Sequence, residues 1–140
     1  MANTVYTPAR EGHLAGEIDW DTATIKAALV RGYTVAASHK FVSDVTTAGG
    51  TLAATSAALT AKTVTGGTAD AADVTFSAVA ANASGHGVLV FQSSAVTGGA
   101  DVAATAQRVI CYLDTGTNLP ITTNGGDVTV AWNASGIYTI

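Results

Sequence analysis

The fold is decided by residues 16–33, which read GEIDWDTATIKAALVRGY. In the second half of this stretch two sets of side chains alternate, Ala23, Ile25, Ala27 and Leu29 against Thr24, Lys26, Ala28 and Val30. An apolar residue at every second position is typical of a half-buried β-strand. No other alternating run carries as many large apolar side chains. We therefore expect one long early strand, around which the later strands pack.

From Thr51 onward the sequence continues in the same manner, with short β-type runs separated by glycine-containing turns. We expect residues 51–59 and 60–65 to form a strand pair or one bent strand, and further strands at 74–79, 88–91, 107–113, 119–123, 127–133 and 137–140. Asn124-Gly125-Gly126 is a strong turn signal, which predicts a hairpin between the strands on either side of it. Residues 69–73, 83–87 and 95–106 are expected to be loops or turns. The pattern predicts a mainly β protein, either an antiparallel β-sandwich or a flattened barrel.

One or two short N-terminal helices precede or interrupt the strands. Thr7 is a suitable N-cap, Pro8 suits the first turn, and Gly16 suits the C-terminal end. A second helix is expected over residues 38–45, capped by Ser38. At 140 residues we expect a single β-rich domain, with an N-terminal arm and short helix in residues 1–16 and a β core in 17–140. The arm, Ala2 to Tyr6, and the short helix are expected to reach a neighbouring subunit.

The composition predicts a thin hydrophobic core. The chain holds 28 Ala and 22 Thr but only 2 Trp, 3 Phe and 4 Tyr. Burying an alanine methyl removes little surface from water, so these residues stabilise the fold weakly. We expect neighbouring subunits to supply part of the burial, as in obligate assemblies.

Charge and hydropathy exclude two classes of partner. The six basic residues do not cluster and the net charge is −4, so the basic patch of a nucleic-acid-binding protein is missing. No secretory signal is visible at the N-terminus, and no apolar run approaches the roughly 20 residues that span a bilayer. We expect neither nucleic acid nor membrane as a partner.

The acidic residues Glu17, Asp19 and Asp21 would share one face of a strand, because they are spaced two apart. Carboxylates on one face can bind a hard cation or form a solvated or subunit-facing acidic patch. The spacing lacks the glycine and the bidentate glutamate of a calcium loop, so we favour the patch and expect no metal site.

No other group of residues carries a catalytic pattern. The three histidines His13, His39 and His86 lack any metal-ligand spacing. Cys111 lies in the apolar run VICYL and is interpreted as a buried, inert thiol, the alternative being a reactive one. No phosphate-binding loop and no nucleophile motif is present. We therefore expect a protein without enzymatic activity and without a cofactor.

The large aromatic residues are the candidate contact residues. Trp20 and Trp132 suit interface hot spots, and they suit equally well the filling of gaps between alanines. Tyr6 lies in the predicted arm, and Tyr33 ends the long strand. We name Tyr6, Trp20, Tyr33 and Trp132 as candidate interface residues.

Several motifs resemble those of a family of small virion structural proteins of tailed bacteriophages. They are residues 6–12, 18–22, 25–30, 58–64, 72–76, 119–120 and 124–132, which together span nearly the whole chain. The segment 80–106 departs from the family, since it is richer in Ala and Gly. The resemblance implies a structural protein present in many copies, made in the host cytoplasm and found in the virion. It favours a capsid decoration protein that binds the major capsid protein on the shell exterior and associates with itself, as a homotrimer.

Two other readings remain open. A tail-associated component would be present in few copies, whereas decoration predicts hundreds that follow the shell symmetry. A receptor- or carbohydrate-binding β-sandwich would require Trp20, Tyr33 or Trp132 on one open face.

Overall fold

The computed structural model describes residues 3–116 and 118–140, so Met1 and Ala2 of the predicted arm lie outside the described residues. The chain is mainly β, with two short helices and strands that pair antiparallel, as predicted. The helices are α1 (Thr7–Ala15) and α2 (Val42–Thr47). The strands are β1 (Thr4–Val5), β2 (Thr24–Arg31), β3 (Thr51–Thr55), β4 (Thr63–Thr65), β5 (Thr68–Asp70), β6 (Val74–Phe76), β7 (Asn82–Ser94), β8 (Arg108–Leu113), β9 (Ile121–Thr123), β10 (Val128–Val130) and β11 (Tyr138–Thr139).

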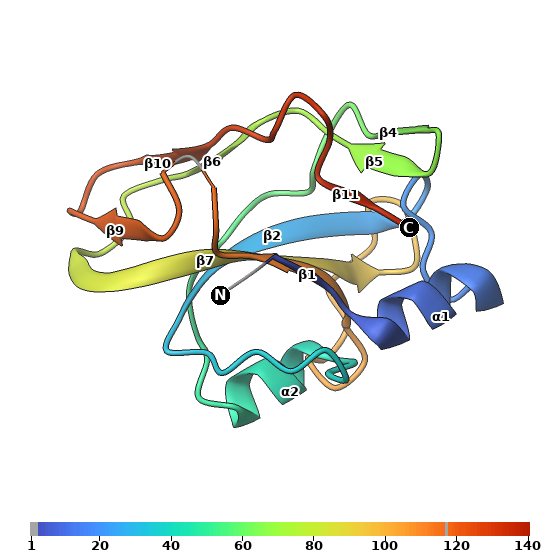
Figure 1. Ribbon diagram of the computed structural model, residues 1–140, viewed down its shortest axis with the longest axis horizontal. Coiled ribbons are helices and arrows are strands. Elements are labelled where there is room, and N and C mark those ends of the chain that lie inside the picture. Colours follow the sequence, from blue (N-terminus) through green and yellow to red (C-terminus); the bar gives the residue numbers. More distant parts are fainter. Residues whose placement is uncertain (1–2, 117) are drawn as a thin grey trace.

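A six-stranded sheet forms the middle of the molecule. Its strand order is β1-β8-β7-β2-β3, and β9 pairs with the first half of β7. Two small sheets, β10-β6 and β11-β5-β4, form a second layer over one face of the large sheet, while α2 lies against the opposite face (Figure 1). The arrangement is sandwich-like. The large sheet stays open, because β1 and β3 end it and do not pair with each other.

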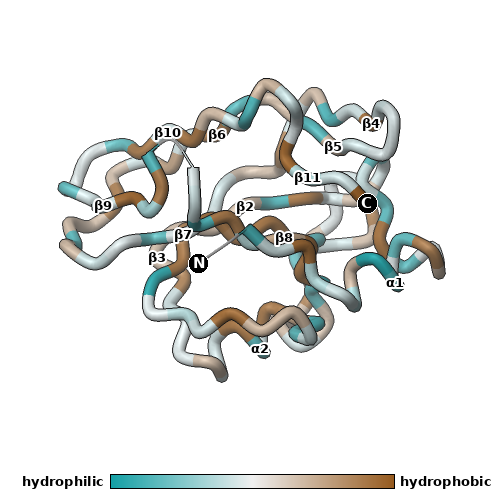
Figure 2. Tube along the Cα trace, viewed as in Figure 1, coloured by the Kyte–Doolittle hydropathy of each residue, from teal (hydrophilic) through white to brown (hydrophobic). Residues whose placement is uncertain are grey.

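Strand β2 is central, as the sequence indicates, but it is shorter and more deeply buried than expected. Ala27, Ala28, Leu29 and Val30 are all fully buried, so both faces of the strand are covered. The second β layer covers one face of this strand and the α2 side of the molecule covers the other, so β2 is not half-exposed. Hydrophobic residues accordingly gather along the middle strands of the large sheet (Figure 2).

The first half of the stretch 16–33 forms a turn and not a strand. Both Asp19 carboxylate oxygens accept hydrogen bonds locally, Oδ1 from the backbone N–H of Asp21 and Thr22 at 3.0 Å and Oδ2 from the Thr22 hydroxyl at 2.6 Å. Glu17 instead forms an ion pair with Arg108 of β8. The prediction that Glu17, Asp19 and Asp21 share one strand face is therefore wrong, because local side-chain bonds to the backbone compete with strand formation here.

The two helices lie close to where they were predicted. Helix α1 ends at Gly16, whose φ of 74° is the left-handed conformation that glycine favours, although its N-cap is Tyr6 and not Thr7. Helix α2 begins at Val42 and not at Ser38. The Asp44 carboxylate accepts hydrogen bonds from the backbone N–H of Lys40 and Phe41, at 2.8 and 2.9 Å, and these bonds fix where the helix begins.

The predicted N-terminal arm is part of the sheet. Strand β1 pairs with β8, with Thr4 opposite Tyr112 and Val5 opposite Cys111. The Tyr6 side chain is fully buried, and its hydroxyl lies 3.0 Å from that of Tyr33. Residues 4–6 therefore belong to this chain's own sheet and core and are not a free arm, while a contact with a neighbour stays a prediction.

Three further predictions are corrected by long-range pairing. Residues 82–87 belong to the 13-residue strand β7 and do not form a turn. Residues 69 and 70, expected to be loop, belong to β5, which pairs with β4 across a turn at Gly66-Gly67. The chain does turn near Asn124, but β9 pairs with β7 and β10 with β6, so no hairpin forms there.

Candidate functional site

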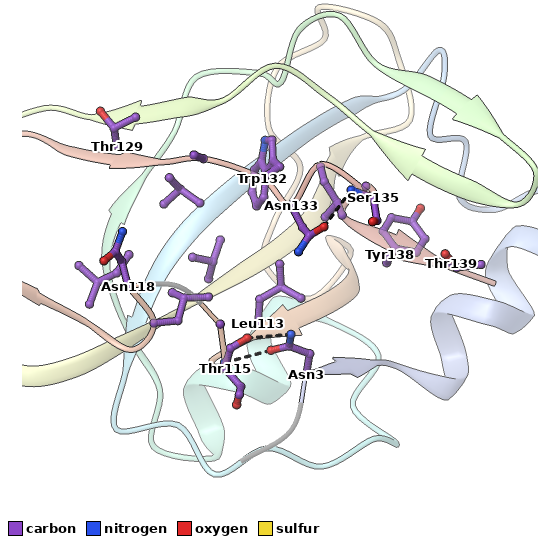
Figure 3. A pocket seen from close by; sticks show the side chains of 18 residues that line it. Asn3, Leu113, Thr115, Asn118, Thr129, Trp132, Asn133, Ser135, Tyr138 and Thr139 are labelled. Carbon is purple, nitrogen blue, oxygen red and sulfur yellow. Dashed lines mark hydrogen bonds between the residues drawn. The ribbon is translucent and has the colours of Figure 1, made fainter.

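A cleft of ≈ 690 Å³ lies between the large sheet and the C-terminal segment (Figure 3). Four parts of the chain that are distant in sequence form it: the end of β8 with the loop to β9, the segment from β10 to β11, Val88 of β7, and Asn3 before β1. Apolar side chains line much of it, namely Val88, Leu113, Leu119, Ile121, Val130 and Ile137. Polar side chains add amides and hydroxyls, namely Asn3, Thr115, Asn118, Thr129, Asn133 and Ser135.

Two aromatic residues complete the lining. The indole of Trp132 is partly exposed, and its Nε1–H donates to the carbonyl of Ala72 at 2.9 Å. The backbone N–H of Trp132 donates to Asp73 Oδ1 at 2.9 Å. Tyr138 is buried and packs edge-on against Trp20, with ring centroids 5.3 Å apart. Hydrogen bonds and ring packing therefore hold both aromatic residues in fixed positions.

Several of the polar residues already have partners. The Asn3 amide donates to Thr115 O and accepts from the backbone N–H of Asp114 and Thr115, all at 3.0 Å. The Thr129 hydroxyl lies 2.9 Å from that of Thr75. These residues stabilise the walls of the cleft and have little hydrogen-bonding capacity left for a ligand.

The cleft is tied to helix α1 through Tyr138. Its hydroxyl lies 3.0 Å from His13 Nε2, and the two rings stack with centroids 5.9 Å apart. Burial lowers the pKa of His13 below its usual 6.5, and the nearby Arg108 cation acts in the same direction. Burial also raises the pKa of the Tyr138 hydroxyl. The folded protein therefore holds a neutral histidine against a neutral tyrosine.

We expect acidification to destabilise the protein through His13. Its pKa is lower in the folded state, so the unfolded chain binds the proton first, and stability falls as the pH drops below about 6.5. Urea unfolding of the wild type and of His13→Gln, at steps between pH 7.5 and 5.5, checks this. The wild type should lose more stability over that range than the variant.

The comparison isolates His13. His39 and His86 are identical in the two proteins, so a difference between the pH profiles is due to position 13. The depressed pKa values of Asp19 and Asp44, caused by hydrogen bonds to those carboxylates, affect stability only at lower pH. Parallel pH profiles for the two proteins would contradict the expectation.

Of the four candidate interface residues, three lie inside this chain. Tyr6, Trp20 and Tyr33 are 0%, 4% and 8% exposed. Tyr33 packs edge-on against Tyr112 at 5.1 Å, and its hydroxyl lies 2.6 Å from His39 Nδ1. These three rings fill the core between small residues, and only Trp132 remains partly accessible from outside. The structure brings Trp20 and Trp132 to the same region, since Tyr138 contacts Trp20 and lines the cleft together with Trp132.

The titratable residues are dispersed. Among residues 3–116 and 118–140, no three His, Cys, Asp or Glu side chains gather as metal ligands would. Cys111 is fully buried, and burial raises the pKa of its thiol. This matches the interpretation of an inert thiol, because the thiolate is the reactive form. In the described part of the chain neither helix has the length and apolar character needed to cross a membrane.

Comparison of the sequence with known protein families and with curated proteins finds no match.

Proposed function

We propose that this chain is a structural protein of a tailed-bacteriophage particle, without enzymatic activity. Its role is to decorate the capsid exterior, where it binds the major capsid protein and copies of itself, as a homotrimer. The sequence motifs described above support this role, and one feature of the fold adds to them. That feature is the outer edge of β3.

Strand β3 ends the large sheet, and in the described part of the chain no strand pairs with its outer edge. Residues 45–61, which include it, carry no charged side chain. Thr51 and Thr55 are exposed, and the three residues between them are half-buried. An open strand edge exposes unpaired backbone N–H and C=O groups, and natural proteins usually protect such edges with charge, proline or a covering element.

An edge without such protection is suited to strand addition by a neighbour. Backbone hydrogen bonds then supply the affinity, and small side chains allow close approach. A shell presents many identical copies of its subunit, so one modest contact per subunit becomes a stable coat when the decorating protein is itself oligomeric. We assign the β3 edge as the contact with the major capsid protein.

The first test is the number of copies per particle, measured by quantitative mass spectrometry of purified virions. Decoration predicts copies in the hundreds, matching the shell symmetry. A few copies would place the protein in the tail and overturn decoration, and its absence from the particle would overturn the virion role altogether.

The second test places positive charge on β3. We expect Thr51→Lys/Thr55→Lys to lower occupancy on undecorated shells at least tenfold, because strand addition would desolvate the new ammonium groups. The matched control is Thr105→Lys/Thr122→Lys, which adds the same charge at exposed threonines outside β3. Both proteins should keep wild-type melting temperatures, since exposed substitutions change stability by about 0.5 kcal/mol or less. Equal occupancy of the two variants would reject the assignment of the edge.

A further inference from the structure

Three polar side chains of the cleft have hydrogen-bonding capacity that the protein does not use. The Asn118 amide and the Ser135 hydroxyl make no hydrogen bond to another described residue. Asn133 accepts through Oδ1 from the backbone N–H of Ser135 at 2.8 Å, and its amide nitrogen points toward the middle of the cleft (Figure 3). Asn118 belongs to the loop before β9, whereas Asn133 and Ser135 belong to the segment before β11. A ligand between these segments therefore meets donors and acceptors from both.

The Trp132 indole offers such a ligand an apolar surface. Its Nε1–H is occupied by the Ala72 carbonyl, so only the ring itself is available for contact. The bonds to Ala72 and Asp73 hold the ring in place before any ligand arrives. A preorganised aromatic side chain gives contact area without the entropic cost of ordering it on binding.

The remaining lining limits the ligand's chemistry. All 18 lining residues that the structure describes are uncharged. A charged ligand would lose hydration there without gaining a counter-charge. A pure hydrocarbon would leave the amides of Asn118 and Asn133 desolvated and without partners. A ligand that satisfies both conditions is neutral, has an apolar face and carries several hydroxyl groups.

We propose that this cleft binds a neutral saccharide. The C–H face of one pyranose ring packs against Trp132, and hydroxyls along the saccharide exchange hydrogen bonds with Asn133 and, toward the two ends of the cleft, with Asn118 and Ser135 (Figure 3). The volume of ≈ 690 Å³ is ordinary for a small-molecule site. This inference goes beyond shell binding and does not depend on it, because β3 does not line the cleft.

Intrinsic fluorescence tests the proposal directly, because the chain has only two tryptophans. Trp20→Phe leaves Trp132 as the single indole reporter. We would titrate this protein with maltotriose, cellotriose, mannotriose, galactotriose and chitotriose, each to about 10 mM, with trigalacturonate as the charged counterpart of galactotriose. The proposal expects saturable quenching by at least one neutral trisaccharide and binding at least tenfold weaker for trigalacturonate. No saturable response to any neutral probe would overturn it, as would tighter binding of the charged one.

Variants locate the binding, with calorimetry in the wild-type background as the readout. Asn118 has a φ of 64°, so Asn118→Gly removes the amide without backbone strain. Asn118→Gly and Ser135→Ala should each weaken binding about 2- to 10-fold. Trp132→Ala should weaken it more than tenfold.

Asn124→Ala is the matched control, because Asn124 lies in a turn and does not line the cleft. This variant should bind the saccharide as the wild type does. Wild-type affinity in both Asn118→Gly and Ser135→Ala would overturn the proposal even where Trp132→Ala fails to fold. Cleft-dependent self-association without saccharide binding, measured by sedimentation, would show that a second copy is the occupant and would equally overturn it.

Discussion

Tyr6→Ala is expected to lower the free energy of unfolding by about 3–5 kcal/mol, the range found when a large buried aromatic side chain is truncated. The Tyr6 side chain is fully buried, and its hydroxyl bonds to that of Tyr33. Its backbone N–H also donates to Ile110 O at 3.1 Å, which continues the pairing of β1 with β8. Domains of this size are stable by only about 5–15 kcal/mol, so the loss is a large fraction of the total. Chemical denaturation monitored by circular dichroism measures it.

Tyr6→Phe is the matched control. It keeps the ring and removes the hydroxyl, so the cost should be only about 1 kcal/mol. Removing residues 1–6 altogether should be at least as damaging as Tyr6→Ala, since it also removes β1. A truncated protein with the wild-type denaturation midpoint would contradict the placement of Tyr6 in the core and would restore the idea of a free arm.

Gly87→Ala is expected to cost about 3 kcal/mol, at the upper end of what overpacking a core usually costs. A Cβ at this position would lie 2.3 Å from the ring carbon Cζ of Tyr112. Tyr112 cannot move away easily, because its ring packs edge-on against Tyr33 at 5.1 Å. Strand β7 cannot shift either, because it pairs with β2 on one side and with β8 on the other. Thermal and urea unfolding of the purified variant measure the cost.

A double-mutant cycle identifies the cause. Tyr112→Leu removes the ring that the new methyl group would strike, at a cost of its own. If the clash with Tyr112 is responsible, the double variant Gly87→Ala/Tyr112→Leu should be more stable than the sum of the two single effects implies. Strict additivity would show that Gly87 is required for some other reason, such as backbone conformation.

The parts of the fold that could be predicted from sequence are those with a local cause. Helix α1 ends at Gly16 because a glycine with positive φ suits a helix C-terminus wherever it occurs. The strands expected at 88–91 and 107–113 are confirmed within β7 and β8, because their apolar residues are buried when both faces of a strand are covered.

The parts that could not be predicted depend on distant partners. Residues 82–87 are rich in Ala, Ser and Gly, which favours a turn. In the structure they belong to β7, because Asn82 and His86 pair with β9 and because His86 and Gly87 pair with β2. The chain turns at Asn124-Gly125-Gly126, but the local sequence does not indicate that β9 pairs with β7 and β10 with β6. The prediction for the acidic stretch before β2 was wrong for the opposite reason. The Asp19 side chain accepts hydrogen bonds from the nearby backbone, and this local bonding forms a turn in place of a strand.

The cleft was only partly visible in the sequence. Trp132 was a candidate contact residue for its size alone, and it is the one of the four that remains partly exposed. Asn118, Asn133 and Ser135 were missed, because polar residues in loops are common and only the folded chain brings these three together. The signal that could have singled out Asn133 and Ser135 is their position directly after an unusual tryptophan in a polar loop.

The order of strands in the large sheet has a consequence for how the protein is made. Residues 4–5 find their partner only at residues 111–112, and the central β2 finds β7 more than fifty residues later in the chain. A ribosome therefore releases β2 together with β3, its partner on one side, well before β7, its partner on the other side, has been synthesised. Sheet assembly must wait until most of the polypeptide has emerged, so folding is largely post-translational and slow for the chain's length. In that interval the apolar side chains of β2 stay exposed to premature association.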